Sequence, residues 1–136
     1  MRYLSRALAQ QGKEQAAEEW LLRACAEAPQ LREPWLEASA FAAARQDWSG
    51  SLYFAQKALQ IRTRGRSYIQ EAESWGARPY DLAALAAYYL GQYALALRYG
   101  REAAELEPEN ERLHENLRFY EAAAGAEKGK EKQAQP

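Results

Sequence analysis

This sequence has few thiol and imidazole side chains, the groups that most often bind zinc or act in nucleophilic and acid–base chemistry. The chain has one cysteine, Cys25, and one histidine, His114, so neither an internal disulfide nor a zinc site of Cys and His ligands can form within it. Cys25 lies on an apolar stretch with helical spacing, where a buried structural thiol is favoured over a reactive one. His114 stands among polar residues near an expected helix start, and we interpret it as a surface or groove residue. The sequence therefore predicts no catalytic residue, no metal and no cofactor.

The composition points to an all-α fold. Alanine (29) and leucine (16) dominate the 136 residues, valine is absent, and the β-branched residues are limited to Ile61, Ile69 and Thr63. Residues that favour strands are thus nearly missing, whereas residues that favour helices abound. The length fits one domain with a real core.

The charges exclude some classes of partner. The 18 basic and 19 acidic residues are interspersed, so no basic patch for nucleic acid or for an anionic membrane is expected. The first residues, MRYLSRALAQQGKEQ, lack the continuous apolar core of a signal peptide, and no apolar run is long enough to span a bilayer. We expect a soluble, cytoplasmic protein without nucleic-acid or membrane partners.

Small residues recur at regular separations along the chain. Ala24, Ala58 and Ala103 form one such series, in which the second separation is longer than the first. Two further series show the same two separations: Ala17, Ser51 and Ala96, and Pro29, Thr63 and Pro108. Periods of this length are typical of helical pairs that stack into a solenoid. The longer second separation predicts an eleven-residue insertion between the second and third pairs.

A unit of about 34 residues with two helices, small residues seven apart on the second helix and a proline five positions later resembles the tetratricopeptide repeat. The residues that carry the resemblance in the three repeats are Leu4, Ser5, Leu8, Gly12, Ala17, Leu21, Ala24 and Pro29; Trp35, Ala38, Ser39, Ala42, Ser51, Ala55 and Ala58; and Tyr80, Ala83, Ala84, Ala87, Gly91, Ala96, Gly100, Ala103 and Pro108. The sequence departs from the pattern at four positions. Thr63 replaces a proline, Gln46 replaces a glycine, and Ala55 and Gly100 each replace a large aromatic residue. Smaller residues at these last two positions predict a closer approach of helices and a tighter superhelix.

The predicted architecture is an all-α, tetratricopeptide-type α-solenoid over residues 1–124. It has about three helix-turn-helix repeats (1–31, 32–76 and 77–110) and a capping helix over 110–123, which turns Leu113 and Leu117 inward. Gly12 and Gly91 are expected to end first helices in a left-handed conformation, and Pro29 and Pro108 to stop second helices. Residues 125–136 are small, charged and nonperiodic, and we expect them to be disordered.

The insertion between the second and third repeats contains two aromatic residues. Tyr68, Ala72 and Trp75 have helical spacing, so the insertion extends the preceding helix or adds a short one. Gly76 is expected to end it, and Pro79 to lie in the first turn of the next helix. We favour the interpretation that the two aromatic residues seal the gap between the repeats; the alternative is a role in ligand binding.

Residues 35–120 resemble, more narrowly, the tetratricopeptide region that follows the catalytic domain in bacterial family 2 glycosyltransferases. The shared elements are Tyr-Ile-x-Glu, Trp-Gly, Pro-Tyr-Asp-Leu and Leu-Gly-x-Tyr, together with the place of the insertion. Those transferases hold a divalent metal through an Asp-x-Asp motif in a separate domain, whereas the only aspartates here, Asp47 and Asp81, stand far apart in the sequence. The resemblance therefore implies a noncatalytic accessory region, with a glycosyltransferase catalytic domain as a partner in the same polypeptide.

First helices of tetratricopeptide arrays line a concave groove that commonly binds a peptide, so the resemblance also implies groove residues. These are Arg6, Gln10, Glu33, Leu36, Ala40, Arg78, Asp81, Leu85, Tyr88, Tyr89, Arg112, Glu115 and Phe119. Tyr88, Tyr89 and Phe119 are candidates for a pocket that takes an apolar or aromatic side chain. The alternative is that one tyrosine belongs to the core and the other to the surface. Asp81 is expected to be a helix N-terminal carboxylate, and Arg78 a solvated residue.

Three functions remain open at this point. The leading one is a noncatalytic module that binds protein or orients domains, as the C-terminal region of a glycosyltransferase-like polypeptide. The second is a freestanding adaptor that binds a partner peptide in its groove. The third is a scaffold whose apolar groove self-associates into a homo-oligomer.

Overall fold

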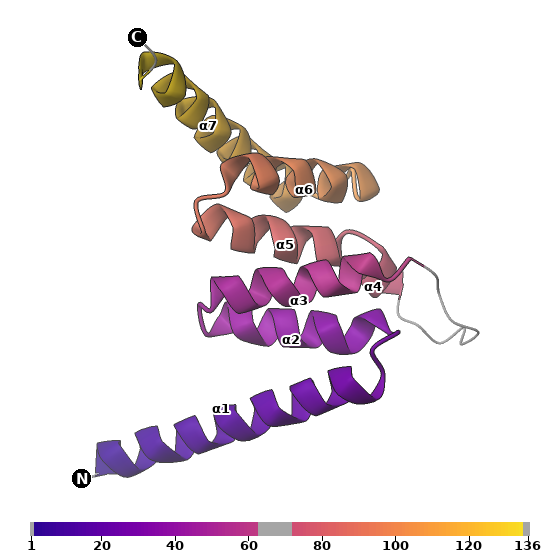
Figure 1. The fold of residues 1–136 in the computed structure, drawn as a ribbon, viewed down its shortest axis with the longest axis vertical. Coiled ribbons are helices and arrows are strands. Elements are labelled where there is room, and N and C mark those ends of the chain that lie inside the picture. The colour runs from indigo at the N-terminus through magenta and orange to yellow at the C-terminus, as the bar shows by residue number, and fades with distance from the viewer. Residues whose placement is uncertain (1, 63–71, 135–136) are drawn as a thin grey trace.

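The computed structural model describes residues 2–62 and 72–134, with side chains described for residues 10–62 and 74–130. Its helices are α1 (Arg2–Glu27), α2 (Arg32–Ala44), α3 (Trp48–Gln60), α4 (Ala72–Trp75), α5 (Arg78–Tyr89), α6 (Tyr93–Leu106) and α7 (Glu111–Ala134). The described ranges are all-helical, without a strand, and consecutive long helices lie side by side in a row (Figure 1). This arrangement is consistent with an α-helical solenoid. None of the described helices combines the length and the apolar character needed to cross a membrane.

The helices α2 and α3 form one antiparallel hairpin, and α5 and α6 form a second (Figure 1). Both hairpins turn through one left-handed residue, Gln46 with φ 60° in the first and Gly91 with φ 78° in the second. Glycine adopts this conformation without steric cost, whereas glutamine adopts it against a steric penalty. The prediction that Gly91 ends a helix in this way is confirmed, and Gln46 makes the equivalent turn without a glycine.

Small residues allow the two helices of each hairpin to approach closely. Ser51 and Ala58 lie fully buried, seven positions apart on α3, as the spacing predicts. The hydroxyl of Ser39 on α2 donates to the carbonyl oxygen of Ser51 at 2.8 Å, and the two hydroxyl oxygens lie 3.1 Å apart. The equivalent positions of the second hairpin are held by buried Ala84 and Ala96. One crossing is thus hydrogen-bonded and the other is purely apolar.

The N-terminal residues form one long helix instead of the predicted helical hairpin. The helix α1 passes through Gly12, which has no positive φ and beside which an added Cβ would meet no atom. An interior glycine costs a helix only about 1 kcal/mol relative to alanine, and the neighbouring glutamine, lysine and glutamate favour helix. The prediction that Gly12 ends a helix is therefore wrong. The C-terminal part of α1 lies near α2, with Cys25 buried, and its N-terminal part extends away (Figure 1).

Proline marks the other helix boundaries as predicted. The helix α1 ends at Glu27, before Pro29, and α6 ends at Leu106, before Pro108. Pro79 lies in the first turn of α5, where its missing N–H leaves no helical hydrogen bond unmade. Local sequence is sufficient to place these ends.

An arginine at the start of α2 ties the insertion to the first hairpin. Arg32 is 6 % exposed and donates from Nε and Nη2 to the carbonyl oxygen of Ile61, at 2.9 and 2.8 Å, and from Nη1 to that of Ser74 at 3.2 Å. Its guanidinium carbon lies 3.9 Å from the ring centroid of Trp75, so the ring and the guanidinium stabilise each other. Trp75 thus packs where the insertion meets α2, in the sealing role that we favoured, and Tyr68 lies outside the described residues.

The last helix extends beyond the predicted cap. Leu113 is buried and Leu117 is partly buried, so both leucines face inward as predicted. The helix then continues to Ala134, where the sequence predicted an end near residue 123 and disorder from residue 125. Alanine, glutamate, lysine and glutamine favour helix enough to offset Gly125 and Gly129, each of which costs about 1 kcal/mol in a helix. This part of α7 projects from the body of the fold (Figure 1).

Candidate functional site

Two hollows are formed by α5 and α7 and lie one after the other along these helices. The first, the charged hollow, has a volume of about 670 Å³ and is lined by Gly76, Ala77, Arg78, Asp81, Leu82, Glu107, Asn110, Arg112 and Leu113. The second, the aromatic hollow, has a volume of about 260 Å³ and is lined by Leu85, Tyr88, Tyr89, Asn116, Phe119 and Tyr120. The predicted groove residues that line one or the other are Arg78, Asp81, Leu85, Tyr88, Tyr89, Arg112 and Phe119.

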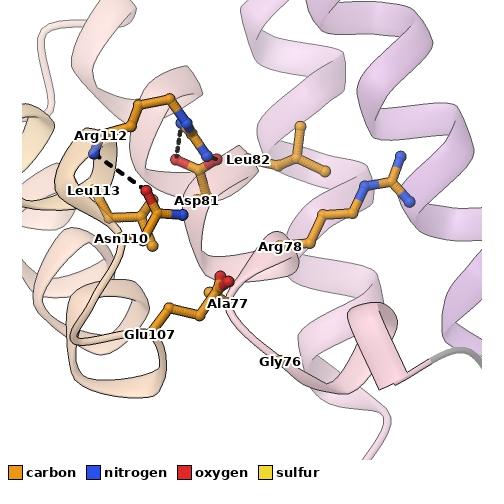
Figure 2. A pocket seen from close by; sticks show the side chains of 9 residues that line it. All are labelled: Gly76, Ala77, Arg78, Asp81, Leu82, Glu107, Asn110, Arg112 and Leu113. Atoms are coloured by element: carbon orange, nitrogen blue, oxygen red, sulfur yellow. Dashed lines mark hydrogen bonds and ion pairs between the residues drawn. The ribbon is translucent and has the colours of Figure 1, made fainter.

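A bidentate ion pair crosses the charged hollow (Figure 2). Arg112 of α7 donates from Nη2 and Nη1 to the two carboxylate oxygens of Asp81 on α5, at 3.0 and 3.4 Å. This pairing with Asp81 raises the pKa of the Arg112 guanidinium, which therefore stays charged. The side chain of Asn110 accepts from the backbone N–H of Arg112 at 3.1 Å and holds the first turn of α7. Asp81 lies in the first turn of α5, as predicted, and in addition joins α5 to α7.

A second ion pair makes a similar connection one hairpin earlier. Arg78 of α5 lies 3.2 Å from a carboxylate oxygen of Glu37 on α2, and it points away from Asp81 (Figure 2). Arg112 follows Arg78 by one repeat period, and each arginine pairs with a carboxylate on an earlier helix. The pair lies at the surface, so it does not contradict the prediction that Arg78 is solvated rather than functional. Exposed ion pairs of this kind contribute at most about 1 kcal/mol to the stability of the folded protein, so their main effect is to orient the side chains.

The aromatic hollow brings three predicted residues together. Tyr89 and Phe119 are among the most exposed large hydrophobic residues, at 57 % and 65 %, and both line the hollow with Tyr88. The ring of Tyr88 lies 5.5 Å from that of Tyr89 and 5.6 Å from that of Tyr120. Tyr88 also packs against the core, so one tyrosine of the pair is partly core and the other is surface, while both form the walls of one hollow.

The exposed ring of Tyr89 is held from outside the hollow. Trp48, the first residue of α3, stacks on Tyr89 with ring centroids 4.4 Å apart and an interplanar angle of 12°. Tyr93, the first residue of α6, lies 5.6 Å from Tyr88. Offset and tilted ring pairs are favourable arrangements. The rings of Tyr88 and Tyr89 are thus preorganised, which lowers the entropic cost of binding.

Tyr120, which the sequence analysis did not identify, forms the buried part of the aromatic hollow. The residue is 3 % exposed, and its hydroxyl oxygen is buried without a hydrogen-bond partner among the described residues. Burial, followed by the charge of Asp81, raises the pKa of Tyr120 well above the ordinary tyrosine value, so the hydroxyl stays protonated. The repeat pattern contained a signal for the burial of Tyr120, because this residue follows the fully buried Ala86 by one repeat period.

The remaining predicted groove residues do not line these hollows. Leu36 is 0 % exposed and belongs to the core; its assignment to the groove is wrong, because α2 is covered by α1, α3 and α5. Ala40 and Glu33 are partly buried, and one carboxylate oxygen of Glu33 is buried without a partner in the described part of the chain. Gln10 and Glu115 are exposed, and the side chain of Arg6 lies outside the described residues.

The two residues with reactive side chains are both engaged in the fold. Cys25 is buried, as predicted, and burial raises the pKa of its thiol, so little thiolate forms at neutral pH. A ring nitrogen of His114 lies 2.7 Å from the carbonyl oxygen of Pro108 at the turn before α7. In the described ranges no three His, Cys, Asp or Glu residues are grouped to hold a metal ion.

No protein-family model matches this chain, and no curated protein matches it. Its function is therefore inferred from its own residues and their geometry.

Proposed function

We propose that the chain is a tetratricopeptide-type module without catalytic activity, which binds a segment of a partner protein along α5 and α7. The repeated features of the two hairpins support the repeat assignment. Gln46 and Gly91 make equivalent left-handed turns, and Arg78 and Arg112 make similar ion pairs to earlier helices. The two turns are separated by one repeat and the insertion, whereas the two arginines are separated by one repeat alone.

The observation that carries the binding function is the aromatic hollow. Two large side chains, Tyr89 and Phe119, remain more than half exposed at its rim, although burying such a ring stabilises a protein by about 1.5–3 kcal/mol. Exposed aromatic residues around a hollow are typical of sites that anchor a side chain of a partner. The charged hollow continues this surface along the same two helices, so an extended segment can contact both.

A displayed peptide library, panned on the full chain, tests this function. Enriched peptides should carry an apolar or aromatic residue, and Phe119→Ala and Tyr89→Ala should each weaken their binding by about tenfold or more, the usual effect of truncating an anchor contact worth about 1.4 kcal/mol or more. Tyr53→Ala is the matched control, because Tyr53 is also exposed, at 53 %, and lines neither hollow. Failure to enrich any peptide, or equal loss in all three variants, would contradict the proposal.

We further propose that the module is the accessory region of a glycosyltransferase-like polypeptide. Some of the residues behind that resemblance belong to the candidate site, because Gly76, Asp81 and Leu82 line the charged hollow. An antibody to this chain should detect a polypeptide far heavier than 15.4 kDa in lysate of the source cells. A band at the mass of the chain itself would contradict the fused arrangement and would favour the freestanding adaptor.

A further inference from the structure

We propose that α1 pairs with the α1 of a second copy of the chain, so that residues 2–11 of each copy cover the exposed face around Trp20 of the other. This pairing leaves the two hollows between α5 and α7 free and therefore goes beyond the proposed function. It is supported by two uncovered residues, by a helix that continues through an expected turn, and by the distribution of charge along α1.

Trp20 on α1 is less covered than its counterparts in the two hairpins. It is 68 % exposed, the highest value among the exposed large hydrophobic residues. Its counterparts Phe54 on α3 and Tyr99 on α6 are partly buried. The ring of each lies 6.3 Å from a ring on the first helix of its hairpin, Trp35 on α2 and Tyr80 on α5. In both hairpins a first helix thus covers this position.

Ala17 shows the same difference. Its counterparts Ser51 and Ala96 are 0 % exposed, where the two helices of each hairpin cross, whereas Ala17 is only partly buried. Among the described helices, α1 packs against α2, which is the next helix in the row. From Ala17 onward, α1 therefore has the packing surface of a second helix without a first helix beside it.

The residues that were expected to form this first helix continue α1 instead. Gly12 precedes the turn residue Gln46 by one repeat period, yet α1 passes through it, and residues 2–11 extend away from the body of the fold (Figure 1). Twelve residues of helix span about 18 Å, so residues 5 and 17 of one α1 cannot meet. Covering Trp20 within the same chain would require the helix to break.

Residues 2–11 nevertheless have the sequence of a covering helix. Leu4, Ser5 and Leu8 precede by one repeat period three buried residues of α2: Ala38, Ser39 and Ala42. Because the hydroxyl of Ser39 donates to the carbonyl oxygen of Ser51, the equivalent neighbours in the first repeat are residues 5 and 17. Exchange of such an element between two copies keeps these contacts and is a low-cost route to a dimer.

Gly12 suits the centre of such a pair. Residues 5 and 17 are equally far from Gln11, so the two-fold axis passes beside Gly12, where no atom lies within 4 Å of an added Cβ and a second backbone can approach. Positions 5 and 17 do not share one face of a straight helix, and a bend at Gly12 turns both toward the partner.

The charges of α1 favour an antiparallel pair. The charged residues are all basic over residues 2–13 and all acidic over residues 14–20: Arg2, Arg6 and Lys13, then Glu14, Glu18 and Glu19. An antiparallel pair places the basic part of each copy beside the acidic part of the other, whereas a parallel pair would place like charges together. Arg45 of α2 faces Glu14 and Glu18, at 3.9 and 2.8 Å, and the exposed Glu19 is left for the second copy.

A disulfide between positions 5 and 17 tests the exchange directly. Ser5→Cys and Ala17→Cys are combined in the full chain with Cys25→Ala, which removes the native thiol, and the oxidised protein should run as a covalent dimer in a denaturing gel. A disulfide closed within one chain, or free thiols that persist, would overturn the inference. Ser39→Cys/Ser51→Cys in the same background is the matched control; these hydroxyl oxygens lie 3.1 Å apart in one chain, so a closed monomer is expected.

Sedimentation equilibrium measures the pairing without a disulfide. The 15.4 kDa chain should form a dimer as its concentration rises, and Trp20→Ala should raise the dissociation constant by about tenfold or more. Tyr53→Ala, at another exposed ring, should leave it unchanged. A monomer at every concentration, or a dimer insensitive to Trp20→Ala, would overturn the inference. A dimer abolished by Phe119→Ala would assign the pairing to the aromatic hollow and would also overturn it.

Charge reversal tests the antiparallel arrangement. Arg2→Glu/Arg6→Glu makes both parts of α1 acidic and Glu18→Lys/Glu19→Lys makes both parts basic, so each variant alone should be monomeric. An equimolar mixture should form a mixed dimer, because each acidic α1 then faces a basic one. The loss of the Glu18–Arg45 pair persists in the mixture and cannot produce this recovery. A mixture that stays monomeric would overturn the arrangement, whereas the displayed peptides decide the proposed function separately.

Discussion

The ring of Tyr120 on α7 lies directly against the backbone of Gly100 on α6. A Cβ added at Gly100 would lie 2.6 Å from Cδ2 and 3.0 Å from Cε2 of that ring, distances that real side chains avoid. The sequence pattern showed Gly100 where the tetratricopeptide repeat has a large aromatic residue, and the structure shows that a ring from the next helix fills the space. Gly100 thus makes room for a ring from α7, whereas the tighter superhelix stays a prediction.

Gly100→Ala is expected to destabilise the protein by about 1–3 kcal/mol, because the added methyl group displaces the Tyr120 ring. Alanine would recover up to about 1 kcal/mol through its better helix propensity, so the packing cost must exceed this gain. Urea unfolding measures the change. Gly129→Ala is the control: an added Cβ there meets no atom, and it should stabilise α7 slightly. A Gly100→Ala variant as stable as Gly129→Ala would contradict the close contact.

Gly12 and Gly91 should respond in opposite directions to the same substitution. Gly12 is inside α1 with no atom near its missing Cβ, so Gly12→Ala should raise the protection of the surrounding amides in hydrogen exchange. Gly91 has φ 78°, and Gly91→Ala should reduce the free energy of unfolding by about 1 kcal/mol, because alanine resists the left-handed conformation. Loss of helix in Gly12→Ala would instead indicate a turn at that position.

The serine pair of the first hairpin should behave as a coupled unit. Ser39→Ala alone leaves the buried hydroxyl of Ser51 without its 3.1 Å partner, at a cost of about 1–2 kcal/mol. The double variant Ser39→Ala/Ser51→Ala should cost less than the sum of the two single changes, because the second hairpin packs with Ala84 and Ala96 at these positions. A double-mutant cycle of urea unfolding measures the coupling. Strict additivity would show that the hydroxyls do not interact.

The buried hydroxyl of Tyr120 should make the stability fall at high pH. Its pKa is raised in the folded protein, so above the ordinary tyrosine pKa of about 10 the unfolded chain loses a proton that the folded chain keeps. The folded state then binds more protons, and the free energy of unfolding decreases as pH rises, by at most about 1.4 kcal/mol per pH unit from this group.

Tyr120→Phe is the variant that isolates this effect. At about pH 8 it should be as stable as the wild type or slightly more stable, because it removes a buried hydroxyl without a partner. As the pH rises above about 10, it should lose less stability than the wild type, whereas Tyr53→Phe, at an exposed position, should lose as much as the wild type. A Tyr120→Phe variant destabilised at neutral pH by more than about 1 kcal/mol, the usual contribution of one hydrogen bond, would show that the hydroxyl has a partner.

Local features of the sequence were sufficient for much of the fold. The composition predicted helices throughout, and Pro29, Pro79 and Pro108 marked helix boundaries that the structure shares. The spacing of small residues predicted the crossings within the two hairpins, at Ser51 and Ala96 among others. These features depend on backbone conformation and on the period of one helix, which a short stretch of sequence contains.

The candidate site was predictable only in part. The resemblance to tetratricopeptide repeats implied that Tyr88, Tyr89 and Phe119 face one groove, and the structure brings all three to one hollow. The same resemblance placed Leu36 in that groove, although other helices cover it. A repeat pattern says which way a residue points from its own helix, but its exposure depends on which helices lie opposite.

What the sequence determined by itself is the helical class, the two central hairpins and their turns, because propensity and spacing act within a few turns of chain. What only the tertiary structure decided is the unbroken α1 through Gly12, the length of α7, the clamp of Arg32 on the insertion and the buried hydroxyl of Tyr120. The helix lengths depend on small balances of propensity that packing can shift. The clamp joins Arg32 to Ser74, 42 residues further along the chain. The burial of the Tyr120 hydroxyl depends on the helices next to α7. Both arrangements form only when the helices pack.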